Sequence, residues 1–78
     1  MEKEIRKQIR EGILSAAEEH GMSLTDACDR IELTLRCGLK SSVPEVRAFW
    51  RRIPAEGKHP TAEEIVGYLT AIYIGLID

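Results

Sequence analysis

The sequence lacks the features of membrane and secreted proteins. Its most apolar run, residues 65–77, is 13 residues long, whereas a helix needs about 20 residues to cross a bilayer. The first 12 residues, MEKEIRKQIREG, contain no apolar segment of a secretory signal. We therefore expect a cytoplasmic protein without a membrane segment.

Motifs of catalysis, metal binding and cofactor binding are also missing. The histidines and cysteines do not have the short spacings of zinc ligands. The chain has no glycine-rich phosphate loop and no nucleophile–base pair. Glu63 and Glu64 are better explained as acids at the positive end of a helix. We expect no enzyme activity, no metal and no cofactor.

The two cysteines are badly placed for a disulfide. Cys28 and Cys37 are nine residues apart on what reads as one helix. At about 1.5 Å per residue, their Cα atoms lie about 13.5 Å apart, and a disulfide spans only about 6 Å. Both should be free thiols.

No charge of one sign dominates the whole chain. The 78 residues carry 11 Lys/Arg and 13 Asp/Glu, a formal net charge of −2, and 44% of them are hydrophobic. This composition excludes intrinsic disorder and a uniformly basic nucleic-acid-binding protein. The distribution is uneven, because residues 30–59 carry seven Lys/Arg against three Asp/Glu while both flanking segments are net negative. Positive charge is concentrated in the middle.

Apolar residues at helical spacing, together with helix-end signals, predict one all-α domain over residues 1–78. The four helices should lie near residues 3–20, 24–37, 43–53 and 62–76. There is no strand alternation and no internal repeat. The predicted fold class is a compact four-helix domain, and a variant helix-turn-helix is one form that it can take.

Short polar motifs mark the helix ends. Ser23, Ser42 and Thr61 each stand three positions before an acidic residue, the spacing of a capping box in which the hydroxyl accepts from a first-turn N–H. Gly38 stands where a left-handed residue would end the second helix. We predict three hydroxyl caps and a helix stop at this glycine.

The stretch SVPEVRAFWRRIP, residues 42–54, has two faces when it is placed on a helix. One is an apolar stripe that should pack, and it consists of Val43, Val46, Phe49, Trp50 and Ile53. The other is cationic and consists of Pro44, Arg47, Ala48, Arg51 and Arg52. Guanidinium groups bind phosphates bidentately and read guanine in the major groove. Exposed arginines are also common on a face that is simply solvated, and the sequence leaves both interpretations open.

The inner stripes of the four helices give a predicted core. It consists of Ile9, Ile13, Leu24, Ile31, Val46, Phe49, Trp50, Ile65, Leu69 and Ile72. On the last helix the main stripe is Ile65, Leu69, Ile72 and Leu76. Ten of the 13 residues from 65 to 77 are apolar, more than one face of a small domain can bury. We therefore expect a homodimer through Tyr68, Ile74 and Ile77, unless the first helix covers this flank.

Two segments resemble the helix-turn-helix domain of the Cro/CI-type phage repressors, HGMSLTDACDRI at residues 20–31 and EGKHPTAEEIVGYLTAI at residues 56–72. In that family a glycine ends the first helix and a Ser-capped second helix carries a small residue, here Cys28, at its crossing point. A Gly-basic-x-Pro loop then opens the next apolar helix. The span from Ser23 to Ile53 is longer than in the compact motif, because CGLKSS replaces its short turn.

The resemblance implies a DNA-binding transcription regulator that uses the third helix for recognition. It assigns five residues to the recognition surface, namely Ser41, Ser42, Arg47, Ala48 and Arg51. It also implies that three residues lie near phosphates, namely Lys40, Arg52 and Lys58.

A protein-binding role is the alternative. The overall acidity, the small size and the lack of catalytic groups also fit a phage-encoded inhibitor that binds a bacterial complex stoichiometrically, for example a defence complex such as CRISPR. In that case the basic middle would contact an acidic or nucleotide-binding surface. The predicted partner is therefore duplex DNA or, alternatively, a bacterial protein complex.

Overall fold

Four helices make up the part of the chain that the structure describes, residues 2–76 of a computed structural model. They are α1 (Lys3–Glu19), α2 (Leu24–Leu39), α3 (Pro44–Arg51) and α4 (Ala62–Tyr73). The all-α prediction is confirmed, and every predicted helix end lies within three residues of the observed one. Among these helices, none is long and apolar enough to cross a membrane.

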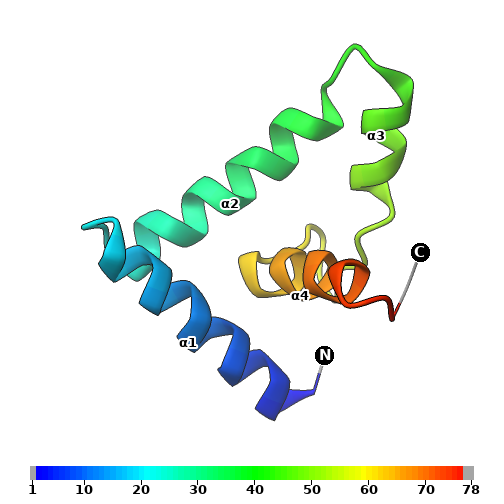
Figure 1. Ribbon diagram of the computed structural model, residues 1–78. Coiled ribbons are helices and arrows are strands. Elements are labelled where there is room, and N and C mark those ends of the chain that lie inside the picture. Colours follow the sequence, from blue (N-terminus) through cyan, green and yellow to red (C-terminus); the bar gives the residue numbers. More distant parts are fainter. Residues whose placement is uncertain (1, 77–78) are drawn as a thin grey trace.

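The helices are arranged around α2, which contacts each of the other three. α1 and α2 meet at a tight turn and diverge from it, and α4 lies between them (Figure 1). The turn depends on Gly21, whose φ of 68° is in the left-handed region that favours glycine. α3 packs at the far end of α2 (Figure 1).

Two of the three predicted hydroxyl caps are present. The Ser23 hydroxyl accepts from the backbone N–H of Asp26 at 3.1 Å. Thr61 and Glu64 form a complete capping box, in which the threonine hydroxyl accepts from the Glu64 N–H at 3.3 Å and the carboxylate accepts from the Thr61 N–H at 2.9 Å. These caps define where α2 and α4 begin.

The predicted cap by Ser42 is wrong. The N-cap of α3 is Val43, which donates its N–H to the Ser41 hydroxyl at 3.1 Å and makes no side-chain cap. The reason is Pro44, which occupies the first turn of α3 and disfavours helical backbone in the residue before it. The helix therefore begins one residue later than the capping-box pattern indicates.

The predicted helix stop at Gly38 is also wrong. Gly38 is buried inside α2, and the helix continues to Leu39 with Lys40 as its C-cap. The Trp50 indole lies directly against Gly38, so a Cβ there would overlap the ring. Because Gly38 has no side chain, α3 can approach α2 closely at this position, and the helix does not end there.

The core consists of two small clusters. The first joins α1, α2 and α4 through Ile13 and three alanines, Ala17, Ala27 and Ala62. The second joins α2, α4 and the end of α3 through Leu35, Ile53 and Ile65. Small residues in the first cluster let three helices approach closely.

Among the predicted core residues, Ile13 and Ile65 are buried, and six others are partly buried. Val46 and Leu69 are each 37% exposed, so their assignment to the core is wrong. Val46 lies in the first turn of the eight-residue helix α3, before the segment that packs on α2. Leu69 lies in the second half of α4, where α1 and α2 have diverged (Figure 1). The predicted stripe position Leu76 is 74% exposed and lies beyond the end of α4.

Candidate functional site

The predicted cationic residues lie around the C-terminus of α2, α3 and the following loop. Lys40 is the C-cap of α2 and Arg52 is the C-cap of α3. Lys58 lies in the loop between α3 and α4, next to His59, which lines the same hollow as Lys40. We use the name basic end for Lys40, Arg47, Arg51, Arg52 and Lys58.

Most of the basic end is free to meet a ligand. Lys40, Arg51, Arg52 and Lys58 are exposed, and none of the four forms an ion pair within residues 2–76. The basic end thus presents four cations without an ion-pair partner among the described residues.

The carboxylates of the same segment are mostly engaged elsewhere. Glu32 accepts from the backbone N–H of Ala62 at 3.3 Å, at the start of α4. Glu56 accepts from the guanidinium of Arg6 on α1 at 3.0 Å. Only Glu45, in the first turn of α3, remains from the three acids of residues 30–59. Two of the three carboxylates in this segment are therefore held by groups outside the basic end.

Arg47 differs from the other cations because it is partly used inside the fold. Its Nη1 donates to the carbonyl oxygen of Ser41 at 2.6 Å, and its side chain is half-buried. The bond holds the turn between α2 and α3, whereas Ser42 and Ala48 are exposed beside it. Arg47 therefore positions α3 and keeps its other N–H groups for a ligand.

α3 is fixed by its aromatic residues and leaves its other face uncovered. Trp50 is half-buried in the second cluster, as a core anchor and not as an exposed stacking residue. Phe49 makes edge contacts with Trp50, at 5.4 Å between ring centroids, and with Tyr68 of α4, at 6.5 Å. One edge of α3 thus joins α2 and α4 while the cationic edge stays open.

A hollow of about 350 Å³ between α2 and the α3–α4 loop adds two residues that the sequence did not single out. Arg36 and His59, both exposed, line it together with Lys40 over the apolar side chains of Leu35 and Leu39, and one carboxylate, Glu32, also lines it. No sequence pattern links positions 36 and 59, because only the path of the loop brings them together. These residues extend the basic end along α2.

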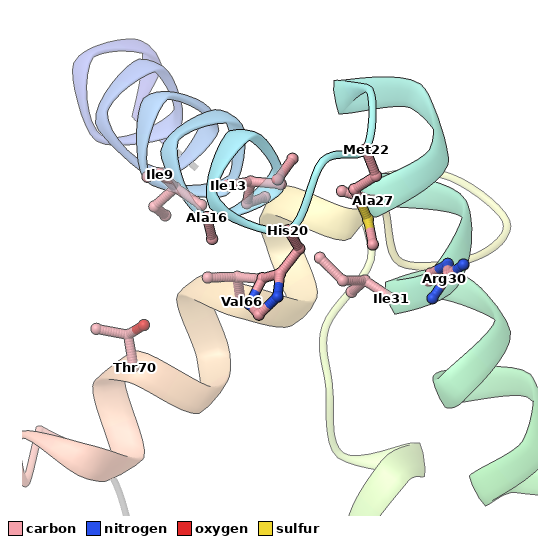
Figure 2. A pocket seen from close by; sticks show the side chains of 12 residues that line it. Ile9, Ile13, Ala16, His20, Met22, Ala27, Arg30, Ile31, Val66 and Thr70 are labelled. Carbon is pink, nitrogen blue, oxygen red and sulfur yellow. The ribbon is translucent and has the colours of Figure 1, made fainter.

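A second candidate surface is apolar and lies between α1, α2 and α4. Figure 2 shows the hollow, about 530 Å³ in volume, with Ile9 and Ile13 on α1, Ile31 on α2 and Val66 on α4 among its lining residues. The polar and charged groups in its lining are His20, Arg30 and Thr70.

An adjoining hollow of about 510 Å³ continues this surface between α1 and α4. Ile9 and Thr70 line both hollows, so the two form one apolar groove, which we call the α1–α4 groove. The remaining lining residues of the second hollow are Ile5, Gln8, Gly67, Ala71, Ile74 and Leu76. None of them is charged.

The predicted dimer residues occupy different environments. Ile74 is 60% exposed and lines the groove. Tyr68 is half-buried and contacts Phe49, so it packs within the domain. Ile77 lies outside the described residues. Ile5, which the sequence did not assign to the dimer interface, also lines the groove and is 47% exposed.

Two carboxylates are buried at the start of α4. Burial raises the pKa of Glu64, but hydrogen bonds from Thr61 and from the backbone N–H of Glu56 outweigh it, so the pKa is lowered. Glu63 accepts from the Arg10 guanidinium at 3.0 Å. Both acids therefore join α1, a loop and α4, in agreement with their interpretation as helix-start residues.

The cysteines are free thiols, as predicted. Burial raises the pKa of Cys28, and the nearby carboxylates of Glu63 and Glu32 raise it further. A thiol that stays protonated is a weak nucleophile. Within residues 2–76, no group of three or more His, Cys, Asp and Glu side chains could hold a metal ion.

Comparisons with protein-family models, curated proteins and solved structures gave no match for this chain. The function is therefore argued from the basic end and the α1–α4 groove themselves.

Proposed function

We propose that the protein binds duplex DNA through the basic end, as a small regulator of the kind that the helix-turn-helix resemblance implies. The observation that carries the proposal is the set of four exposed cations without internal partners, beside two carboxylates that are engaged within the fold. Each lysine or arginine that neutralises a phosphate releases a counterion, which supplies most of the affinity of non-specific DNA binding.

The dimensions of α3 support an approach to the major groove. An α-helix with its side chains is about 10–12 Å across, and the groove is about 12 Å wide, so the eight-residue α3 can enter it. In this proposal Ser42, Ala48 and Arg51 face the bases. Lys40, Arg52 and Lys58 contact phosphates. Ser41 and Arg47 keep α3 at its angle to α2, through the bond at 2.6 Å.

A pair of charge-matched variants tests this proposal. Arg51→Gln/Arg52→Gln removes two cations from the basic end, and Lys3→Gln/Lys7→Gln removes two exposed cations from α1. Fluorescence anisotropy with a labelled random duplex at low salt should show at least tenfold weaker binding for the arginine variant, since two phosphate or base contacts are lost. The lysine variant should bind within about twofold of wild type. Equal losses in the two variants would mean that the arginines are only solvated.

The α1–α4 groove favours a second candidate function, stoichiometric binding of a protein partner. An uncovered apolar groove is typical of protein interaction sites. The inhibitor of a bacterial complex considered from the sequence would contact its partner through the basic middle, and the groove would add an apolar contact. Salt separates the two functions, because an apolar contact keeps its affinity when salt is raised and phosphate binding does not.

A further inference from the structure

We propose that the α1–α4 groove is covered by the α1–α4 groove of a second copy of this chain, in a two-fold symmetric dimer. This inference does not depend on DNA binding, since the groove contains no residue of the basic end.

The size of the exposed surface gives the first argument. The chain exposes 5789 Å², whereas a compact monomer of its mass exposes about 4,800 Å². Its radius of gyration is 12.8 Å, against about 11.5 Å for a compact domain of this length. The excess area is about 1,000 Å², close to the roughly 800 Å² that each partner contributes to a standard interface.

The groove is the part of the surface that fits such an interface. Side chains of the second hollow are uncovered, with Ile5 47%, Ile74 60% and Leu76 74% exposed. Monomers rarely leave a continuous apolar surface of this extent uncovered. Gly67 and Ala71 on α4 leave room for a helix to approach closely, because neither has a large side chain.

The shape and chemistry of the groove favour a second copy over other occupants. The face of the α1–α4 groove contains hollows around Ile9 and Thr70. The exposed side chains of Ile74 and Leu76 project from the same face. A two-fold axis sets the projections of one copy against the hollows of the other. The lining of the second hollow is uncharged and that of the first contains one permanent charge, Arg30, so two identical faces can meet there with little repulsion. Apolar contacts are characteristic of homodimers.

A membrane surface is a poorer occupant. Helices that lie on anionic lipid carry lysine or arginine along their polar face. α4 contains neither residue, and its first turn carries two acids, Glu63 and Glu64. On α1, the other wall of the groove, Arg6 and Arg10 are paired with Glu56 and Glu63, which leaves Lys3 and Lys7 as its cations for a lipid headgroup.

The test compares two exposed apolar side chains, one inside the groove and one outside it. Ile74→Asp places a charge in the groove, and Leu33→Asp places the same charge on α2, where Leu33 is 51% exposed and lines neither hollow. Sedimentation equilibrium of wild type should give twice the chain mass of 8.8 kDa. Ile74→Asp should raise the dimer Kd at least about a hundredfold, because the two-fold interface contains each substitution twice. Leu33→Asp should leave it within about threefold.

Ile5→Asp, on the α1 side of the groove, provides an independent variant and should weaken the dimer in the same way. Far-UV circular dichroism should show wild-type helix content for all three variants. A wild-type monomer at high concentration would overturn the proposal. So would an Ile74→Asp protein that dimerises as wild type does, or a Leu33→Asp protein that dissociates as readily as Ile74→Asp.

Discussion

Replacing Gly38 with alanine tests how α3 is held against α2. The added Cβ would overlap Cδ1 and Nε1 of Trp50 and lie 2.6 Å from its Cγ. The indole, or the whole of α3, must therefore move. Crowding of this kind costs about 1–3 kcal/mol, whereas alanine in place of glycine inside a helix contributes about 1 kcal/mol of stabilisation. Because three ring atoms stand in the way, we expect the crowding to win.

The expected net loss is up to about 2 kcal/mol in the free energy of unfolding, which corresponds to a fall in Tm of up to about 15 °C for a domain of this size. Urea unfolding followed by circular dichroism measures it. Gly12→Ala is the matched control, since Gly12 lies inside α1 and a Cβ there meets nothing within 4 Å. It should stabilise the protein by up to about 1 kcal/mol. If Gly38→Ala stabilises the protein as much as Gly12→Ala does, the described packing of Trp50 on α2 is incorrect.

Three further predictions concern single groups. Folding lowers the pKa of Glu64, so its contribution to stability is complete above the unfolded pKa of about 4.3 and is lost as the pH falls through the folded value. The difference in unfolding free energy between wild type and Glu64→Gln should therefore shrink from pH 6 to pH 3 in urea titrations, and a constant difference would contradict this reasoning. In labelling with a thiol reagent at neutral pH, the exposed Cys37 should react well before the half-buried Cys28, whose pKa is raised; faster reaction of Cys28 would show that α2 is oriented differently. Arg47→Ala should cost about 1 kcal/mol, the worth of its hydrogen bond to Ser41, and thermal unfolding identical to wild type would show that this bond does not hold the turn.

The helix starts show what local sequence could predict. Ser23 and Thr61 cap α2 and α4 because the whole motif lies within four consecutive residues. Ser42 has the same spacing to an acid, but Pro44 inside the motif shifts the cap to Val43. The sequence contained this information, since the effect of proline on the preceding residue is local.

The misplaced residues needed information from distant parts of the chain. Gly38 is of the residue type that commonly ends a helix. Its role inside α2 depends on Trp50, which lies on another helix and packs against it. Periodicity put Val46 and Leu69 on inward faces but could not show which helix covers each face. A short α3 and a diverging α1–α2 pair leave both uncovered.

The candidate site also contains features that the local sequence could predict and features that depend on distant parts of the chain. The basic segment was visible in the sequence, because its cations are close together in the chain. The internal bonds of Glu32 and Glu56 join this segment to α4 and α1 and could not be predicted. Arg36 and His59 meet only through the loop.

The salt dependence of DNA binding tests the central claim most directly. Wild-type protein should be titrated into a labelled random duplex at several salt concentrations, and the logarithm of the binding constant plotted against the logarithm of the salt concentration. The three exposed cations assigned to phosphates, Lys40, Arg52 and Lys58, predict a straight line with a slope of about −3 per protomer, at about −0.9 for each phosphate neutralised. A slope near zero, or no binding at the lowest salt, would contradict the proposed function of the basic end.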